Sequence, residues 1–208
     1  MASACGKENF PQEALEEFTK FALECIQQQD SKLELRETSI SYFSDISKIL
    51  KSQFAPILDT VLQPILEVAC TDDGVVEKVQ GKEKKAIPLV SDSEDEEVVG
   101  LGLDSNFLDE KAASIQALGN ICLNCAGIMQ PHMSIVMETL KQLETYVEDN
   151  IRFHVVQAYA HIAFGLLRLH TGNPDSEENY SWERGLPAKT PLPAPVLQYL
   201  QTIIFPRF

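Results

Sequence analysis

Long apolar runs are missing from this sequence. No stretch of about 18 consecutive apolar residues occurs, which is the length that a membrane-spanning helix requires. Residues 1–10 also lack the apolar segment of a secretory signal peptide. We therefore predict a soluble chain that is not secreted and does not insert into a membrane.

Basic residues are scarce as well. The 208 residues include 17 Lys and Arg against 31 Asp and Glu, which gives a formal net charge of −14 at pH 7. Binding to nucleic-acid phosphates requires clustered Lys and Arg side chains, so this balance argues against nucleic acid as a partner. It favours ligands with a basic surface instead.

Recognisable catalytic and metal-binding patterns are also absent. The four histidines have no Ser, Cys or carboxylate partner at a diagnostic spacing, and no G-x-S-x-G motif or phosphate-binding glycine loop occurs. Cys122 and Cys125 form a C-x-x-C spacing, but no second pair supplies two further ligands. We interpret these two of the five cysteines as small core residues with reduced thiols, as is usual in the cytosol or nucleus. The chain is predicted not to be an enzyme and to need no cofactor or metal.

The sequence does contain a shifted copy of itself. Lys111, followed by two apolar helical turns, recurs as Arg152 after 41 residues, which is the length of one helical hairpin in a HEAT-type solenoid. Overlaying the copies pairs Ile115 with Val156 and, further along, apolar residues at helical spacing. An earlier copy begins at Arg36, but it precedes Lys111 by 75 residues. One repeat must therefore contain an insertion of about 34 residues.

We predict an all-α fold in which residues 1–208 form a single HEAT-repeat superhelix of about three to four repeats. Residues 75–105 are expected to be a flexible acidic insertion between the two helices of one repeat, and residues 171–193 a loop. Both ends of the chain carry apolar helices without a polar capping repeat, which suggests a fragment, a truncated product or reliance on a partner. The expected helices cover residues 11–29, 33–50, 54–70, 108–126, 131–146, 151–170 and 195–204.

Two groups of polar residues are candidates for ligand binding. The first is the acidic run of the insertion, Asp92, Glu94, Asp95, Glu96 and Glu97. Ser91 and Ser93, each with an acid three residues later, are candidate phosphorylation sites within it. The second lies at matched positions of the inner helices: Ser41, Asp45, Gln116, Asn120, Gln157 and His161.

Stacked repeats would align the second group into a polar ladder. With a mobile anionic loop nearby, this surface suits extended segments rich in Lys and Arg, which gain electrostatic steering and salt-sensitive affinity. The alternative is that the ladder and the acidic run are only solvated surface, as most charge runs are.

The order of motifs is distinctive. An apolar helix pair is followed by SDSEDEE, a glycine-containing linker VVGLGLDSNFLDEK, the helix DEKAASIQALGNICLNCAGIMQPHM and then VEDNIRFHVVQAY. Over roughly residues 33–169 this resembles the middle HEAT repeats of the importin-beta family of nuclear transport receptors.

The resemblance implies a receptor segment that moves between cytoplasm and nucleus and binds basic cargo, such as histones or ribosomal proteins, for nuclear import. It also implies contact with nucleoporins and with the small GTPase Ran through the acidic loop. Ran binding is expected to be weak or absent, because the family's amino-terminal repeats, which make the principal Ran contact, have no counterpart here. Two other readings stay open: a HEAT scaffold unrelated to transport, such as a phosphatase subunit or tubulin-binding array, and a truncated inactive fragment.

Overall fold

The computed structural model describes residues 11–28, 32–71, 75–77, 101–103, 105–171, 194–204 and 206. The α-helices there are α2 (Gln12–Gln27), α3 (Leu33–Leu50), α4 (Ala55–Cys70), α5 (Ser105–Asn124), α6 (Ala126–Met129), α7 (Met133–Leu143), α8 (Asp149–Thr171) and α9 (Ala194–Tyr199). Short 3-10 turns, Lys51–Phe54 and Gln130–His132, precede α4 and α7, and a π-helical turn, Leu200–Ile204, follows α9.

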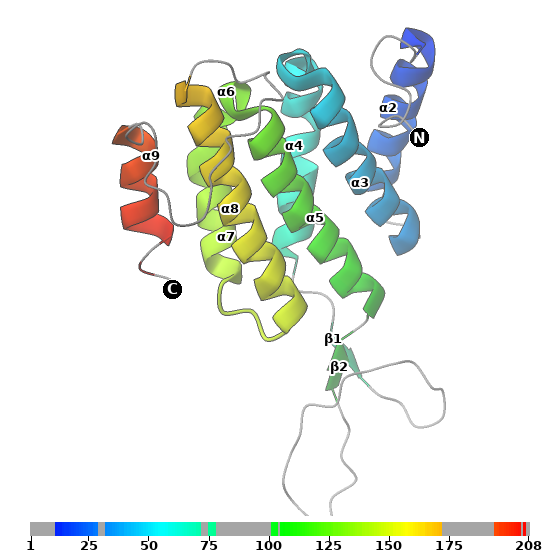
Figure 1. Cartoon of the computed structure of the whole chain (residues 1–208). Helices are drawn as coiled ribbons and strands as arrows, with labels where there is room; N and C mark the ends of the chain where they lie inside the picture. Colours follow the sequence, from blue (N-terminus) through cyan, green and yellow to red (C-terminus); the bar gives the residue numbers. More distant parts are fainter. Residues whose placement is uncertain are drawn as a thin grey trace, which may run out of the picture.

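The helices form two layers. Helices α3, α5 and α8 lie side by side, and the packing of α2 on α3, α4 on α5 and α7 on α8 makes the second layer (Figure 1). We call the α3–α5–α8 layer the inner layer and the α2–α4–α7 layer the outer layer. This arrangement confirms the predicted all-α HEAT-type solenoid. Each inner helix contains one of the three repeated basic residues in its first two turns: Arg36 in α3, Lys111 in α5 and Arg152 in α8.

The core lies between the two layers, as the helical spacing of apolar residues requires. Each inner helix buries a set of large side chains against the outer layer. These sets are Ile40, Phe43 and Ile46 in α3, Ile115, Leu118 and Ile121 in α5, and Val155, Tyr159 and Ile162 in α8.

One prediction of this packing was wrong. Val156 was expected to be the buried counterpart of Ile115, but Val156 is 44% exposed, and the neighbouring Val155 is buried. Val156 is exposed because α8 contacts only α5 among the described inner helices, whereas α5 has an inner helix on both sides.

Helices α5 and α8 approach each other closely at two glycines. A Cβ atom on Gly119 of α5 would lie 2.8 Å from Ala158 Cα of α8. A Cβ atom on Gly165 of α8 would meet the carbonyl oxygen of Cys122 in α5. The absence of side chains at these positions therefore sets the spacing between the two helices.

Several predicted boundaries differ from the observed ones. The helix expected at 54–70 is preceded by a 3-10 turn, and the one expected at 108–126 begins at Ser105 and is followed by the separate short α6. The helix expected at 131–146 extends only over Met133–Leu143, and the last helix changes to a π-turn at Leu200. Backbone hydrogen bonding at these ends, rather than side-chain pattern, decides such positions.

The insertion between α4 and α5, residues 75–105, has a short strand at each end of its sequence, which the sequence analysis did not predict. Val75–Glu77 (β1) pairs antiparallel with Leu101–Leu103 (β2), so the two ends of the insertion come together before α5 begins (Figure 1). Within the part of the chain that the structure describes, the two strands pair only with each other.

Helix α9 packs on α8 through Val196 and Tyr199, which are buried. The Tyr199 hydroxyl donates to the Tyr159 carbonyl oxygen at 3.3 Å. Among the described residues, no single helix has the length and apolar character to cross a membrane; Ser105–Asn124 and Ala126–Leu143 reach that threshold only together, across a 113° bend.

Candidate functional site

The candidate ladder lies on the inner layer, with residues drawn from all three of its helices. Ser41 and Asp45 of α3 and Gln116 of α5 are exposed, and Gln157 of α8 is half-buried. Because α5 packs between α3 and α8, Ser41, Gln116 and Gln157 occupy equivalent positions on three neighbouring helices. Polar groups from residues far apart in sequence thus share one surface.

Asn120 has a second role that the sequence did not reveal. Its side-chain amide donates to the Ser44 hydroxyl of α3 at 2.8 Å, and one turn later Asn124 donates to the Ser47 hydroxyl at 3.1 Å. Ser44 and Ser47 are buried, so these bonds satisfy polar groups inside the α3–α5 contact. Two asparagines spaced by four and two serines spaced by three are the signal that could have identified this pair of bonds.

His161 faces the α5–α8 contact. A Cβ on Gly119 would lie 3.3 Å from its Nδ1 atom, and this atom is buried with no hydrogen-bond partner among the described residues. Burial lowers the pKa of His161, which keeps the imidazole neutral at pH 7. At the ladder position of α8, therefore, a neutral ring packs against α5.

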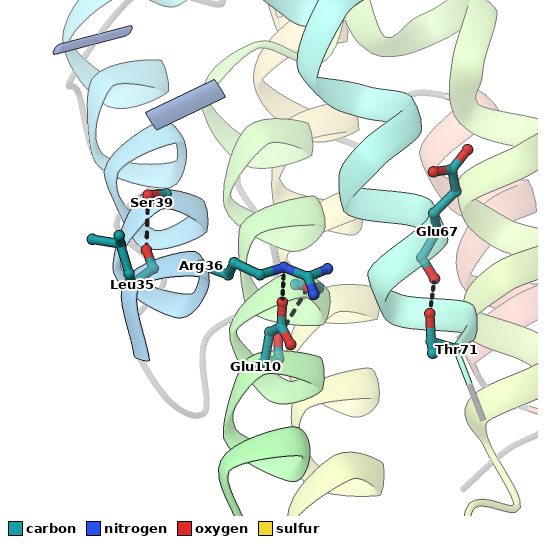
Figure 2. Close-up of polar contacts among 7 residues, drawn as sticks. Leu35, Arg36, Ser39, Glu67, Thr71 and Glu110 are labelled. Atoms are coloured by element: carbon teal, nitrogen blue, oxygen red, sulfur yellow. Dashed lines mark hydrogen bonds and ion pairs between the residues drawn. The ribbon is translucent and has the colours of Figure 1, made fainter. Parts of the chain in front are cut away.

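Arg36 and Glu110 join α3 to α5 where the inner helices begin. Arg36 Nε lies 2.9 Å from Glu110 Oε1, and the Glu110 side chain is 4% exposed (Figure 2). Burial raises the pKa of Glu110, the Arg36 charge lowers it and the Glu37 charge raises it again, with a net shift upward. The desolvation of this carboxylate therefore outweighs its attraction to Arg36.

Lys111 and Arg152, which mark the repeats, bind carbonyl oxygens at the ends of the preceding outer helices. The fully buried Lys111 donates from Nζ to the Ala69 carbonyl oxygen at 2.6 Å, near the end of α4. Arg152 donates to the Tyr146 carbonyl oxygen at 2.6 Å, beyond the end of α7. A cation at a helix carboxyl terminus satisfies carbonyl groups that have no partner within the helix. In α5 and α8 the repeated basic residue thus fastens the inner helix to its outer partner, whereas Arg36 of α3 pairs with Glu110 of α5.

The acidic run and its candidate phosphorylation sites lie outside the described residues. Asp92, Glu94, Asp95, Glu96, Glu97, Ser91 and Ser93 stay predictions for this reason. Their point of attachment is described, because β1 and β2 place the base of the insertion at the beginning of α5.

The C-x-x-C pair lies in the core. Cys122 is 1% exposed, and burial raises the pKa of its thiol to about 12, so it stays protonated at neutral pH. Cys125 Sγ lies 3.5 Å from the Ser47 carbonyl oxygen and 3.3 Å from that of Lys51. Within the described ranges, no three His, Cys, Asp or Glu side chains gather closely enough to hold a metal ion.

Helix α8 carries exposed aromatic residues that the sequence reading did not anticipate. Phe153 is 62% exposed and Phe164 is 55% exposed. Both share a helix face with Gln157, at separations of four and seven residues. The inner surface is therefore polar along α3 and partly apolar along α8.

Comparison with known proteins finds a likeness to an importin subunit. No protein-family profile matches the chain. The chain is similar to the probable importin subunit beta-4 of Schizosaccharomyces pombe (strain 972 / ATCC 24843), with 25% identity over 213 residues. The aligned region covers 98% of this chain and 19% of that protein, so the chain spans about one fifth of the length of this relative. This likeness confirms the resemblance to the importin-beta family of nuclear transport receptors that the sequence predicted.

Proposed function

We propose that this chain is a cargo-binding segment of a nuclear transport receptor and that its inner layer binds basic proteins for nuclear import. The observation that carries the proposal is the exposed polar surface formed jointly by α3, α5 and α8, in a chain with a net charge of −14. The likeness to an importin subunit supports this function over a scaffold unrelated to transport. The chain would act in both cytoplasm and nucleus.

The acidic insertion is proposed as a second contact for the same cargo. Its base lies at the beginning of α5, next to the end of the inner surface that carries Glu34 and Asp109. Five acids in the run Ser91–Glu97 would raise the local concentration of a Lys- and Arg-rich segment and speed its association. Contact with Ran is expected to be weak, and nucleoporin binding belongs to the same proposal.

The test measures binding of a fluorescent histone-tail peptide to the full chain by anisotropy. We expect wild type to bind at about 50 mM salt and to weaken several-fold at about 200 mM, because exposed charges are screened. Changing Asp92, Glu94, Asp95, Glu96 and Glu97 to the corresponding amides should weaken binding at low salt and flatten the salt dependence.

The matched control removes five other negative charges, from exposed glutamates of the outer layer. These are Glu13, Glu17, Glu24, Glu67 and Glu138, each changed to Gln. If the loop and outer-layer variants weaken binding equally, only net charge matters and the loop has no specific role. If the wild-type chain does not bind the peptide at either salt concentration, the cargo-binding proposal is wrong.

A further inference from the structure

The inner surface is acidic on α3 and aromatic on α8. On α3, the residues that share a face with Ser41 include Glu34, Glu37 and Asp45. On α8, the corresponding face presents Phe153 and Phe164. The middle helix α5 presents Gln116 and Asp109 between them.

Repeat-equivalent positions show that this change runs directly across the inner layer. Glu37 follows Arg36 by one residue, and Phe153 follows Arg152 by one residue, so they lie at the same level of their helices. One turn earlier, Glu34 and Asp109 also occupy equivalent positions on α3 and α5. Acidic side chains and Phe153 are thus presented at one end of the surface, the end at which β1 and β2 lie, whereas Phe164 lies about three turns further along α8.

The cations on this face lie at the other end of the inner helices. Lys48 is in the last turn of α3, and Arg168 is in the last turn of α8. At the opposite end, Arg36 is held by Glu110, and Arg152 binds the Tyr146 carbonyl oxygen and Asp149. Negative charge therefore dominates the end of the inner surface that carries Glu34, Glu37 and Asp109 on α3 and α5 and Phe153 on α8.

From these positions we infer that the ligand of the inner surface is a two-part extended segment, with Lys or Arg residues over α3 and α5 and an apolar residue on Phe153 of α8. This inference rests on the proposed cargo-binding function and adds a second chemical requirement to it. A purely basic segment would leave Phe153 in water, whereas an apolar side chain placed there removes apolar area from water.

The dimensions of the inner layer set the spacing between the two parts. Packed helices lie about 8–10 Å apart, so α3 and α8 are separated by roughly 20 Å across α5. An extended chain advances about 3.3–3.6 Å per residue, so the basic and apolar groups should be about six residues apart.

The test uses two fluorescent peptides of equal length and charge with the full chain. Both contain a Lys-Arg pair and a Gly-Ser spacer of four residues, and they end in Phe in one peptide and in Ser in the other. We expect the Phe peptide to bind wild type about tenfold more tightly, as burial of one large apolar side chain allows. The variant Phe153→Ala should lose this difference and bind the Ser peptide as wild type does.

Two controls separate the surface from its surroundings. Ile135→Ala removes an exposed apolar side chain from the outer helix α7 and should leave both affinities unchanged. Glu34→Gln/Glu37→Gln should weaken both peptides alike, because it removes charge without touching the aromatic side. Circular dichroism of each variant checks that the helices are intact.

The possible outcomes distinguish the two proposals. Equal binding of the Phe and Ser peptides by wild type overturns the two-part ligand and leaves basic-cargo binding standing. Binding of neither peptide overturns both. If the Phe153→Ala variant is instead a monomer where wild type is a dimer by light scattering, Phe153 joins two copies of the chain, and the inference is wrong.

Discussion

Residues buried between the inner helices connect the stability of this fold to its proposed binding surface. Asn120 and Asn124 bind Ser44 and Ser47, and Arg36 meets Glu110, all within the α3–α5 contact. Each of these polar groups must be satisfied when it is removed from water, which restricts α5 to one register on α3. The exposed positions beside them, such as Ser41 and Gln116, are thereby held in fixed relation.

Lys51 lies at the carboxyl end of α3 with φ 50° and ψ −118°, and it is the only described non-glycine residue with a positive φ. This conformation costs a side-chain-bearing residue about 1–3 kcal/mol, whereas glycine adopts it freely. We predict that Lys51→Gly raises the free energy of unfolding by about 1 kcal/mol after the added entropy of the unfolded chain is counted. Lys48→Gly, in the last turn of the same helix, should lower it by about 0.5–1 kcal/mol. Urea denaturation measures both, and equal losses would contradict the prediction.

Glu110 should make stability depend on pH in an unusual direction. Its folded pKa lies above the ordinary value of 4.5, because burial outweighs the Arg36 charge, so the folded chain holds this proton more tightly than the unfolded chain. The favourable contribution of the protonated carboxyl is present below 4.5 and is lost as pH rises through the raised pKa.

Glu110→Gln mimics the neutral carboxyl and should remove this dependence. Relative to wild type, the variant is expected to gain stability as pH rises from about 4.5 to 7, with little difference at the acid end. Thermal unfolding at a series of pH values measures the difference, with Glu138→Gln on the exposed face of α7 as the control. A variant that loses stability relative to wild type as pH rises would show that attraction to Arg36 dominates.

At the scale of the helices, the close contact between α5 and α8 depends on glycine at positions 119 and 165. Gly165 lies against the Cys122 backbone, which cannot move without shifting the whole of α5. We predict that Gly165→Ala lowers the free energy of unfolding by about 1–3 kcal/mol, as overpacking does in other cores.

The matched control for this prediction is Gly127→Ala in α6. A Cβ there would lie 3.8 Å from Leu169 Cδ1, which is ordinary contact. Chemical denaturation should find the control within about 0.5 kcal/mol of wild type. Similar losses in the two variants would mean that the α5–α8 spacing does not depend on Gly165.

The repeat in the sequence predicted which helices form the inner layer, because Arg36, Lys111 and Arg152 each lie in the first two turns of such a helix. There Arg36 contacts the Glu110 carboxylate, and Lys111 and Arg152 bind carbonyl oxygens. It could not predict that Val156 is exposed, since burial depends on whether a neighbouring helix covers that side. Nor could it reveal the aromatic side of the candidate site, because the exposure of Phe153 and Phe164 depends on how α8 is placed beside α5. The positions of the polar ladder could be predicted, but the Asn120–Ser44 bond could not, because it joins two residues that are 76 apart in sequence and depends on how closely their helices pack.

At the scale of the whole molecule, the net charge of −14 should make the fold more stable and the binding of a basic ligand weaker as the salt concentration rises. Self-repulsion destabilises the compact state, and salt screens it. Attraction to a basic ligand is screened by the same ions. A loss of binding at higher salt therefore cannot be attributed to unfolding if the fold is more stable there.

We predict that raising the salt concentration from about 20 to about 150 mM raises the melting temperature of the chain while weakening its binding of a histone-tail peptide. The outer-layer variant with Gln at positions 13, 17, 24, 67 and 138 carries five fewer negative charges, so its melting temperature should respond less to salt. Its binding should still weaken with salt, because the acids of the inner layer and of the insertion are unchanged. Differential scanning calorimetry and anisotropy on the same samples measure the two responses. A melting temperature that falls with salt would show that specific ion pairs, rather than the excess of acids, govern the electrostatics of this fold.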